Sequence, residues 1–175
     1  MYWRLTQSQF RKQKGAANKR ALGKIVASGE APGLLAYAGG EPVGWCAIAP
    51  RETYIRLEGS RILKPVDSQP VWSVVCFFVA KPFRRRGVTV ALIRAATEYA
   101  EERGAVVIEG YPIDAATGTI PDVFAWTGLA PAFRKAGFDE VARRSPARPI
   151  MRYESAGHKS TAKTQSRAKK RKNTD

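Results

Sequence analysis

The chain is poor in cysteine and histidine and has no long hydrophobic run, and each shortage excludes a class of protein. Its 175 residues include two cysteines and one histidine, too few to assemble a Cys/His zinc cluster. No run of carboxylates has the spacing of a calcium loop. The apolar stretches are a handful of residues long, far below the roughly 18 that a membrane span needs. We therefore expect no metal and no transmembrane helix.

The two cysteines, Cys46 and Cys76, stand far apart inside apolar runs that are typical of strands. No secretory signal of basic, apolar and small residues opens the sequence. This pattern does not resemble the disulfide framework of a secreted domain. We expect a cytoplasmic protein with reduced thiols and no membrane partner.

Acidic residues are also scarce, with 15 Asp plus Glu against 30 Lys plus Arg, a net charge of +15. Such an excess favours an anionic partner, such as a nucleic acid or a phosphorylated cofactor. The charge gathers at both ends: seven basic residues and no acid within residues 1–24, and seven basic residues and one acid within 157–175. We expect a folded domain over residues 1–154 and a disordered basic tail over 155–175.

The first part of the chain predicts a helix followed by a hairpin. Thr6 and Gln9 have the spacing of a capping box, and apolar residues then recur at helical spacing until Gly29, which predicts one basic amphipathic helix. Residues 34–38 and 43–49 alternate like strands on either side of Gly39-Gly40, a typical hairpin turn. A short helix over residues 51–57 and a loop over 59–70 should follow.

The centre of the chain predicts a strand, helix, strand crossover. Residues 71–80 are apolar on both faces, as in a buried strand. A loop with three arginines leads to a helix over about 90–103, closed by Gly104, and then to a second buried strand over 105–111. After an irregular segment, Pro131 opens a short helix, and residues 138–144 and 149–153 form the closing strands.

The segment Arg84-Arg85-Arg86-Gly87-Val88-Thr89 carries the clearest functional signal, because it joins the end of a buried strand to the start of a helix. Unpaired N–H groups at a helix start form an anion pocket, and a glycine lets a ligand approach the main chain closely. Three neighbouring arginines repel one another unless an anion joins them. Neither G-x-x-x-x-G-K-[ST] nor G-x-G-x-x-G is present. The segment therefore predicts a phosphate site outside those two families.

The pattern Arg84-x-x-Gly87-x-Thr89 resembles the signature of the GNAT superfamily of acyl-CoA-dependent N-acyltransferases, in which a glycine or alanine is usual where Thr89 stands. The order of elements over residues 34–153 and the late Gly137-Phe138 pair are also similar to that family. The resemblance implies an α/β (α+β) fold with a mixed sheet that is parallel and splayed at its centre and is flanked by helices.

The resemblance also implies a site for acetyl-CoA. The N–H groups of residues 85–89, including Val88, and the arginines Arg84, Arg85 and Arg86 would bind the pyrophosphate. The main chain at Phe78 and Val79 would bond the pantetheine arm like an added strand. The reaction would be direct transfer of acetyl to a primary amine. Phe133 stands where many relatives carry a tyrosine acid, and we expect it to pack on the pantetheine.

Glu109 interrupts a buried run near the end of its strand, and Tyr111 shares its face by the period of two. We predict Glu109 as the base, with a structural ion pair to an arginine as the alternative, and Tyr111 as the acid, with a proton from water or an unprotonated thiolate as the alternatives. Phe124 and Trp126 lie in the irregular segment that should cover the site. Both are candidate walls of the acceptor pocket.

Two other functions remain open from the sequence. A nucleic-acid or ribosome-associated module could use the basic first helix and the tail, although no base-reading motif is present. A non-catalytic acyl-CoA-binding protein could share the fold, a reading that Phe133 motivates. The sequence leaves the acceptor and the oligomeric state undetermined.

Overall fold

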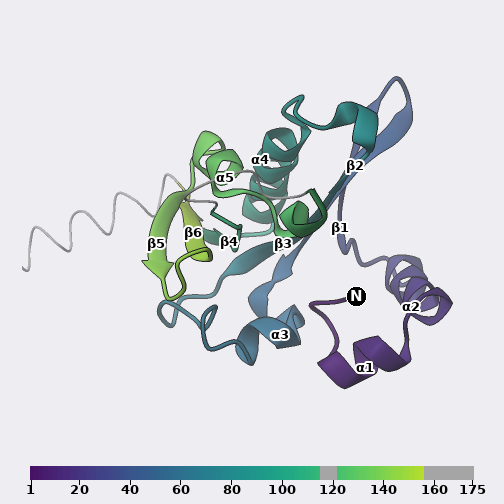
Figure 1. Cartoon of the computed structure of the whole chain (residues 1–175), viewed down its shortest axis with the longest axis horizontal. Coiled ribbons are helices and arrows are strands. Elements are labelled where there is room, and N and C mark those ends of the chain that lie inside the picture. The colour runs from purple at the N-terminus through teal and green to yellow at the C-terminus, as the bar shows by residue number, and fades with distance from the viewer. Residues whose placement is uncertain (115–121, 156–175) are drawn as a thin grey trace, which may run out of the picture.

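The computed structural model describes residues 1–114 and 122–155, without the side chains of residues 122–124. Six strands form a single sheet in the order β1-β2-β3-β4-β6-β5 (Figure 1). Neighbouring strands are antiparallel, except β3 and β4, which run parallel at the centre. The strands are β1 (Gly33–Ala38), β2 (Glu41–Pro50), β3 (Trp72–Val79), β4 (Val107–Gly110), β5 (Asp139–Arg143) and β6 (Pro149–Glu154).

Several of the helices are short. The α-helices are α1 (Gln7–Lys12), α2 (Ala16–Ala27), α3 (Ile55–Glu58), α4 (Val88–Glu101) and α5 (Ala130–Lys135), and the 3₁₀ helices are η1 (Arg51–Thr53), η2 (Lys81–Phe83) and η3 (Asp122–Thr127). The predicted crossover is confirmed, since α4 joins the parallel strands β3 and β4. Helix α4 begins two residues earlier than expected.

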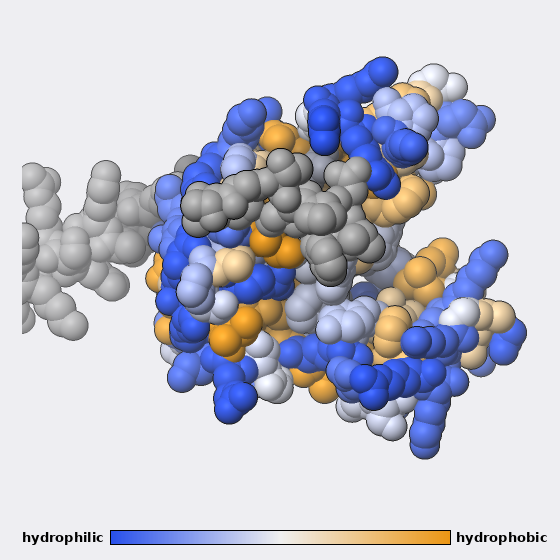
Figure 2. Space-filling view, in the orientation of Figure 1, coloured by the Kyte–Doolittle hydropathy of each residue, from blue (hydrophilic) through white to orange (hydrophobic). Residues whose placement is uncertain are grey.

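The prediction of one helix over the first part of the chain is wrong. The capping box at Thr6 and Gln9 forms, but Gly15, with φ of 71°, separates α1 from α2. A positive φ lies outside the helical range, so the chain turns there. No residue of either helix is buried. Figure 2 shows hydrophilic side chains projecting from the lobe that these helices form at the lower right.

Two apolar clusters cover the two faces of the sheet. On one face, α4 and α5 pack through Leu92, Ile93 and Phe133 against sheet residues such as Val74 and Ile108. The other face is covered by Trp3, Tyr54, Leu57 and Leu63, which come from the N-terminal segment and the connection between β2 and β3. The sheet is therefore buried on both sides near its centre, as the apolar run of β3 predicts.

The β1–β2 hairpin forms as predicted. Gly39 and Gly40 have φ values of 59° and 84°, the left-handed pair that a two-residue hairpin turn requires. The end of β3 is the exception to the predicted burial, since Phe78 is 59% exposed. Ser155 donates its N–H to Val106, while the rest of the predicted basic tail lies outside the described residues.

None of the helices in the described ranges is long and apolar enough to cross a membrane.

Candidate active site

A tight turn connects the end of β3 to the start of α4. Within the described ranges, Arg85 is the only non-glycine residue with a positive φ, 61°, and Gly87 follows with φ of 82°. Gly87 caps α4, and its carbonyl accepts the first helical bond, from Ala91. The N–H groups of the first turn of α4 have no partner within the helix. They point out of the helix end, where its dipole favours an anion.

The turn carries three arginines directly before the start of α4. All three are exposed, and the guanidinium carbon of Arg86 lies 5.9 Å from the centre of the Phe83 ring. Arg84 donates from Nε to the carbonyl of Val79 over 3.1 Å, which ties the turn to the end of β3. A Cβ added to Gly87 would meet nothing within 4 Å. Open space, exposed cations and main-chain donors thus come together at one place.

The central sheet opens beside this turn. β4 pairs with β3 only from Trp72 to Val74, whereas β3 continues to Val79 along β2. The edge of β3 beyond Val74 therefore has no partner in β4. Because main-chain groups alternate in direction along a strand, half of those beyond Val74 face the opening. The predicted central splay is confirmed, and Phe78 and Val79 lie on this edge.

A β-bulge marks the point at which the sheet opens. Ala47 pairs with Cys76 and Ile48 pairs with Val74, so Val75 has no partner in β2. The extra residue turns two consecutive side chains, Val75 and Cys76, toward the face that carries the N-terminal segment. Bulges of this kind often re-aim side chains next to active sites.

Phe133 fills the opening from the other face. It is fully buried, and its ring meets Phe77 and Phe138 edge to face, with centroids 5.9 Å and 5.3 Å away. A Cβ on Gly110 would overlap the Phe133 ring, and one on Gly128 would crowd it. Phe133 is therefore a core residue whose ring is not accessible to a ligand in this structure. Its contact with pantetheine stays a prediction.

A pocket of about 110 Å³ lies on the bulged face, between the sheet and the N-terminal segment. Trp126, one of the two predicted acceptor residues, lines it together with Trp45, Val75 and Cys76. The other predicted residue, Phe124, has its side chain outside the described part of the structure. The N-terminal residues Trp3 and Arg4 also line it.

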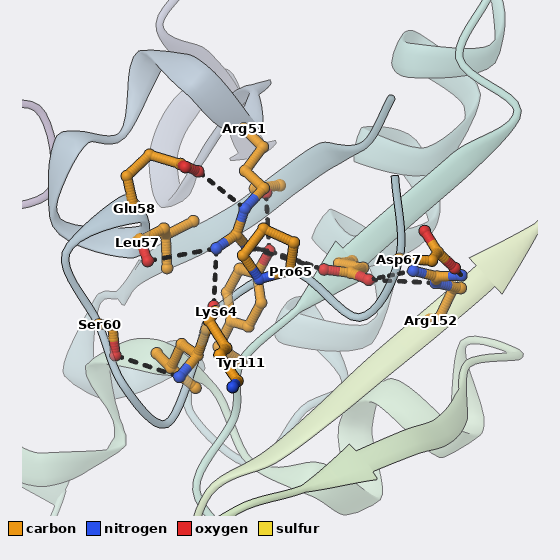
Figure 3. A network of polar contacts seen from close by, with 12 residues as sticks. Arg51, Leu57, Glu58, Ser60, Lys64, Pro65, Asp67, Tyr111 and Arg152 are labelled. Carbon is orange, nitrogen blue, oxygen red and sulfur yellow. Dashed lines mark hydrogen bonds and ion pairs between the residues drawn. The ribbon is translucent and has the colours of Figure 1, made fainter. Parts of the chain in front are cut away.

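Glu109 and Tyr111 lie together in a buried polar network, and Figure 3 shows Tyr111 in this network with Arg51 and Arg152. Arg152 donates to Glu109 Oε1 from Nε and Nη2, over 3.1 Å and 2.7 Å. The Tyr111 hydroxyl donates to Glu109 Oε2 over 3.0 Å. The alternative of a structural ion pair is therefore present in the structure, and neither residue lines the pocket.

Arg51 connects this network to α3 and to the segment that follows it. It donates to the Tyr111 hydroxyl over 2.7 Å and to the carbonyls of Leu57 and Leu63 over 3.2 Å and 2.7 Å. Ser73 shares a hydrogen bond with the same hydroxyl. Burial, followed by the nearby charge of Glu109, raises the pKa of Tyr111. The phenol therefore remains protonated at neutral pH.

The cysteines are free thiols. Burial raises the pKa of Cys46 to about 12, and it also raises the pKa of Cys76. A thiol becomes a nucleophile as the thiolate, so the structure supports no covalent role for Cys76. Within the described ranges, no three His, Cys, Asp or Glu side chains are placed to hold a metal ion.

Sequence reasoning missed two parts of this site. Tyr54 lines the pocket from the β2–β3 connection, where a lone tyrosine has no distinguishing pattern. No sequence pattern marks the bulge at Val75 either, because the apolar run of β3 would look the same with or without an extra residue. Only the pairing of β2 with β3 shows it.

Comparison with known proteins gives a consistent picture. Residues 1–114 match the sequence pattern of the acetyltransferase (GNAT) family. No curated protein matches the sequence closely. Among solved structures, a GNAT-family acetyltransferase from Streptococcus agalactiae 2603 is 12% identical, with a TM-score of 0.52 over 85% of this chain and 79% of its own.

Two further structures are similar. AAC(6')-Iy, in complex with the bisubstrate analogue CoA-S-monomethyl-acetylneamine, is 22% identical, with a TM-score of 0.51 over 82% of this chain and 86% of its own. A ribosomal-protein-alanine N-acetyltransferase from Brucella melitensis is 18% identical, with a TM-score of 0.49 over 79% of this chain and 76% of its own. At these identities, the two structures with TM-scores above 0.5 show the fold alone.

Proposed function

This chain belongs to the GNAT family of acetyltransferases, and from that premise we propose that it transfers the acetyl group of acetyl-CoA directly to a primary amine. Acetyl-CoA, when bound, supplies the acetyl group as a thioester. The amine nitrogen forms a bond to the carbonyl carbon, the carbon–sulfur bond breaks, and the thiolate leaves with the electron pair. The surplus proton of the amine passes to solvent or to a nearby base.

The turn from Arg84 to Thr89 is the observation that carries this proposal. Its exposed arginines and the open helix end at Gly87 suit a pyrophosphate, which needs several donors and positive charge at one place. Since no side chain occupies the space above Gly87, the main chain is open to close approach. Arg85 and Arg86 would neutralise the phosphate charge.

The unpaired edge of β3 supports a place for the pantetheine arm. Amide groups of the arm can bond main-chain groups near Phe78 and Val79 in the manner of an added strand. The arm then runs from the turn toward the bulge at Val75. A main-chain N–H at the bulge is suited to stabilise the negative charge that develops on the thioester oxygen.

Glu109 as base and Tyr111 as acid stay predictions. Both carboxylate oxygens of Glu109 already accept hydrogen bonds, and the Tyr111 hydroxyl has three partners. These contacts favour positioning of the strand ends beside the opening over direct proton transfer. Water in the pocket is then the simplest carrier of the proton from the amine.

The turn is tested by calorimetry with coenzyme A on two matched glycine variants. Gly87→Ala and Gly104→Ala replace glycines at opposite ends of α4, with φ values of 82° and 81° and nothing within 4 Å of the added Cβ. Both should lose about 1–2 kcal/mol of stability, because left-handed backbone disfavours a side chain. Only Gly87→Ala should also weaken coenzyme A binding, by about tenfold or more.

Charge reversal provides a second test. Arg85→Glu with Arg86→Glu should abolish binding at near-physiological ionic strength, since two phosphate partners become repulsive. Arg61→Glu changes an exposed arginine outside the turn and should leave the affinity unchanged. Equal affinity in all these proteins would refute the proposed pyrophosphate site.

A further inference from the structure

We propose that the pocket between the β3 bulge and the N-terminal segment binds the acceptor, and that this acceptor is a small amine combining an apolar body with a carboxylate, as in an apolar α-amino acid. The inference rests on the proposed function, because it assumes that acetyl transfer takes place at the opening of the sheet. It goes further by assigning the substrate class.

The pocket is in the right place to present an amine. The bulge directs Val75 and Cys76 into it, and the same residues lie where β3 loses its partner β4. An amine in the pocket would therefore meet a thioester arriving along the free edge of β3. Helix α4 lies on the opposite face of the sheet, and the arginine turn lies at the end of β3. The amine and the acetyl-CoA would therefore enter from different sides.

The charge of the pocket excludes polycations. Among the residues that line it, none is Asp or Glu, and Arg4 carries the only charged side chain. Arg4 is held by Glu30, with 2.8 Å between Nη1 and Oε1. A polyamine or an aminoglycoside would bring further ammonium groups next to this arginine, with no lining carboxylate to pair them.

Unpaired donors indicate what the acceptor carries besides its amine. Trp3 Nε1, Arg4 Nη2 and Tyr54 Oη are buried and have no hydrogen-bond partner in the described part of the structure. All three residues line the pocket. Burial raises the pKa of Tyr54, so its hydroxyl keeps a proton to donate. Three donors, one of them cationic, fit the oxygens of a carboxylate.

The remaining walls are apolar and the space is small. Trp45, Trp126 and Leu22 line the pocket, and its volume of about 110 Å³ is below the about 150 Å³ of an apolar cavity that holds benzene. A branched aliphatic side chain is the size that such a space takes. These observations point to an amino acid such as leucine as the probe.

The test titrates the full chain, saturated with coenzyme A, with three amines. L-leucine has the predicted features, isoamylamine has the same apolar body without the carboxylate, and spermidine is a polycation. We expect leucine to bind about tenfold or more tightly than the other two, and to be acetylated fastest when acetyl-CoA is supplied. Absence of leucine binding, or equal binding of either other amine, would overturn the inference.

A single hydroxyl provides the matched variant. Tyr54 is 1% exposed, and Tyr37, on β1, is 61% exposed. Tyr54→Phe removes an unpartnered group, so the melting temperature should stay the same or rise, while leucine affinity falls about fivefold or more. Tyr37→Phe should change neither quantity. Unchanged leucine affinity in Tyr54→Phe would contradict the pocket assignment.

Coenzyme A binding separates the two levels of the proposal. A chain that fails to bind coenzyme A refutes the proposed function itself. A chain that binds coenzyme A and acetylates spermidine in preference to leucine refutes only the substrate class inferred from the pocket.

Discussion

Glu109 owes its partners to strand pairing. It lies opposite Arg152 on β6 and beside Ser73 on β3, so the register of three strands places a carboxylate between an arginine and a hydroxyl. Glu109 is 1% exposed, and a buried charge is tolerated only when it is paired and hydrogen bonded. The arrangement holds β3, β4 and β6 together next to the opening of the sheet.

Glu109→Gln tests whether this residue is structural or catalytic. The substitution leaves Arg152 and Arg51 facing a neutral amide in a buried place, and breaking a buried ion pair costs about 3–5 kcal/mol. We expect a loss of this size in the free energy of unfolding in guanidinium chloride. The pH dependence of turnover should keep its shape in whatever folded protein remains.

Asp67 provides the control for that experiment. It is the second carboxylate partner of Arg152, at 2.6 Å, but its side chain is 36% exposed. Asp67→Asn should cost less than about 1 kcal/mol, because solvent reaches the Asp67 carboxylate and the buried Arg152 keeps Glu109 as its partner. If Glu109→Gln were equally mild, and if it removed one limb of the pH–rate profile, Glu109 would be the base.

Elements with local signals could be predicted from the sequence. The capping box at Thr6, the hairpin at Gly39-Gly40 and the glycine that closes α4 act through neighbouring residues, and all three form. The break at Gly15 was not predicted, because apolar spacing continues across it while one left-handed residue redirects the chain. The bulge at Val75 depends on pairing between strands, which spacing along one strand does not contain.

Arg143 links β5 to the chain that follows β4. It donates to Asp114 Oδ2 over 2.7 Å and to Glu140 Oε2 over 2.6 Å. Hydrogen bonding to Arg143 is the main cause that lowers the pKa of both carboxyl groups from their ordinary values of 3.8 and 4.5. A lowered pKa in the folded state makes stability depend on pH.

The sign of that dependence follows from the direction of the shifts. The contribution is fully present above the unfolded values of 3.8 and 4.5, and it is lost as the pH falls through the lower folded values. Arg143→Met should therefore make the decline in unfolding free energy below about pH 4.5 shallower. The measurement is chemical unfolding between neutral pH and about pH 3.

A second arginine on the surface provides the comparison. Arg103 contacts Glu102 at 3.7 Å, and both side chains are exposed to solvent. Arg103→Met should leave the acid decline as steep as in the unaltered protein. If both variants behaved alike, the ion pairs of Arg143 would not contribute to acid stability.

The charge of the whole molecule is unevenly distributed. Residues 1–24 contain seven basic residues and no acid, and most of these lie exposed on α1 and α2. Such a surface favours contact with the negatively charged phosphate backbone of a nucleic acid. The basic lobe is compatible with the nucleic-acid alternative, but it lies on α1 and α2 rather than at the arginine turn, so the two sites would act independently.

The parts of the candidate site that are formed by neighbouring residues in the sequence could be predicted, and the parts formed by distant segments could not. The turn from Arg84 to Thr89 is contiguous, so its position before α4 and its exposed arginines could be predicted from sequence alone, while its phosphate chemistry stays a prediction. The pocket was predictable only through Trp126, because Trp3, Arg4 and Tyr54 reach it from distant segments. The core position of Phe133 was not predictable either, since it depends on Gly110 and Gly128 leaving room for its ring.

The most direct measurement of the central claim is an electron-density map of crystals grown with acetyl-CoA. The account predicts diphosphate density against the main chain of residues 85–89, with the pantetheine arm along the free edge of β3 and the thioester near Val75. Diphosphate density elsewhere, or a closed sheet with acetyl-CoA absent at saturating concentration, would contradict it.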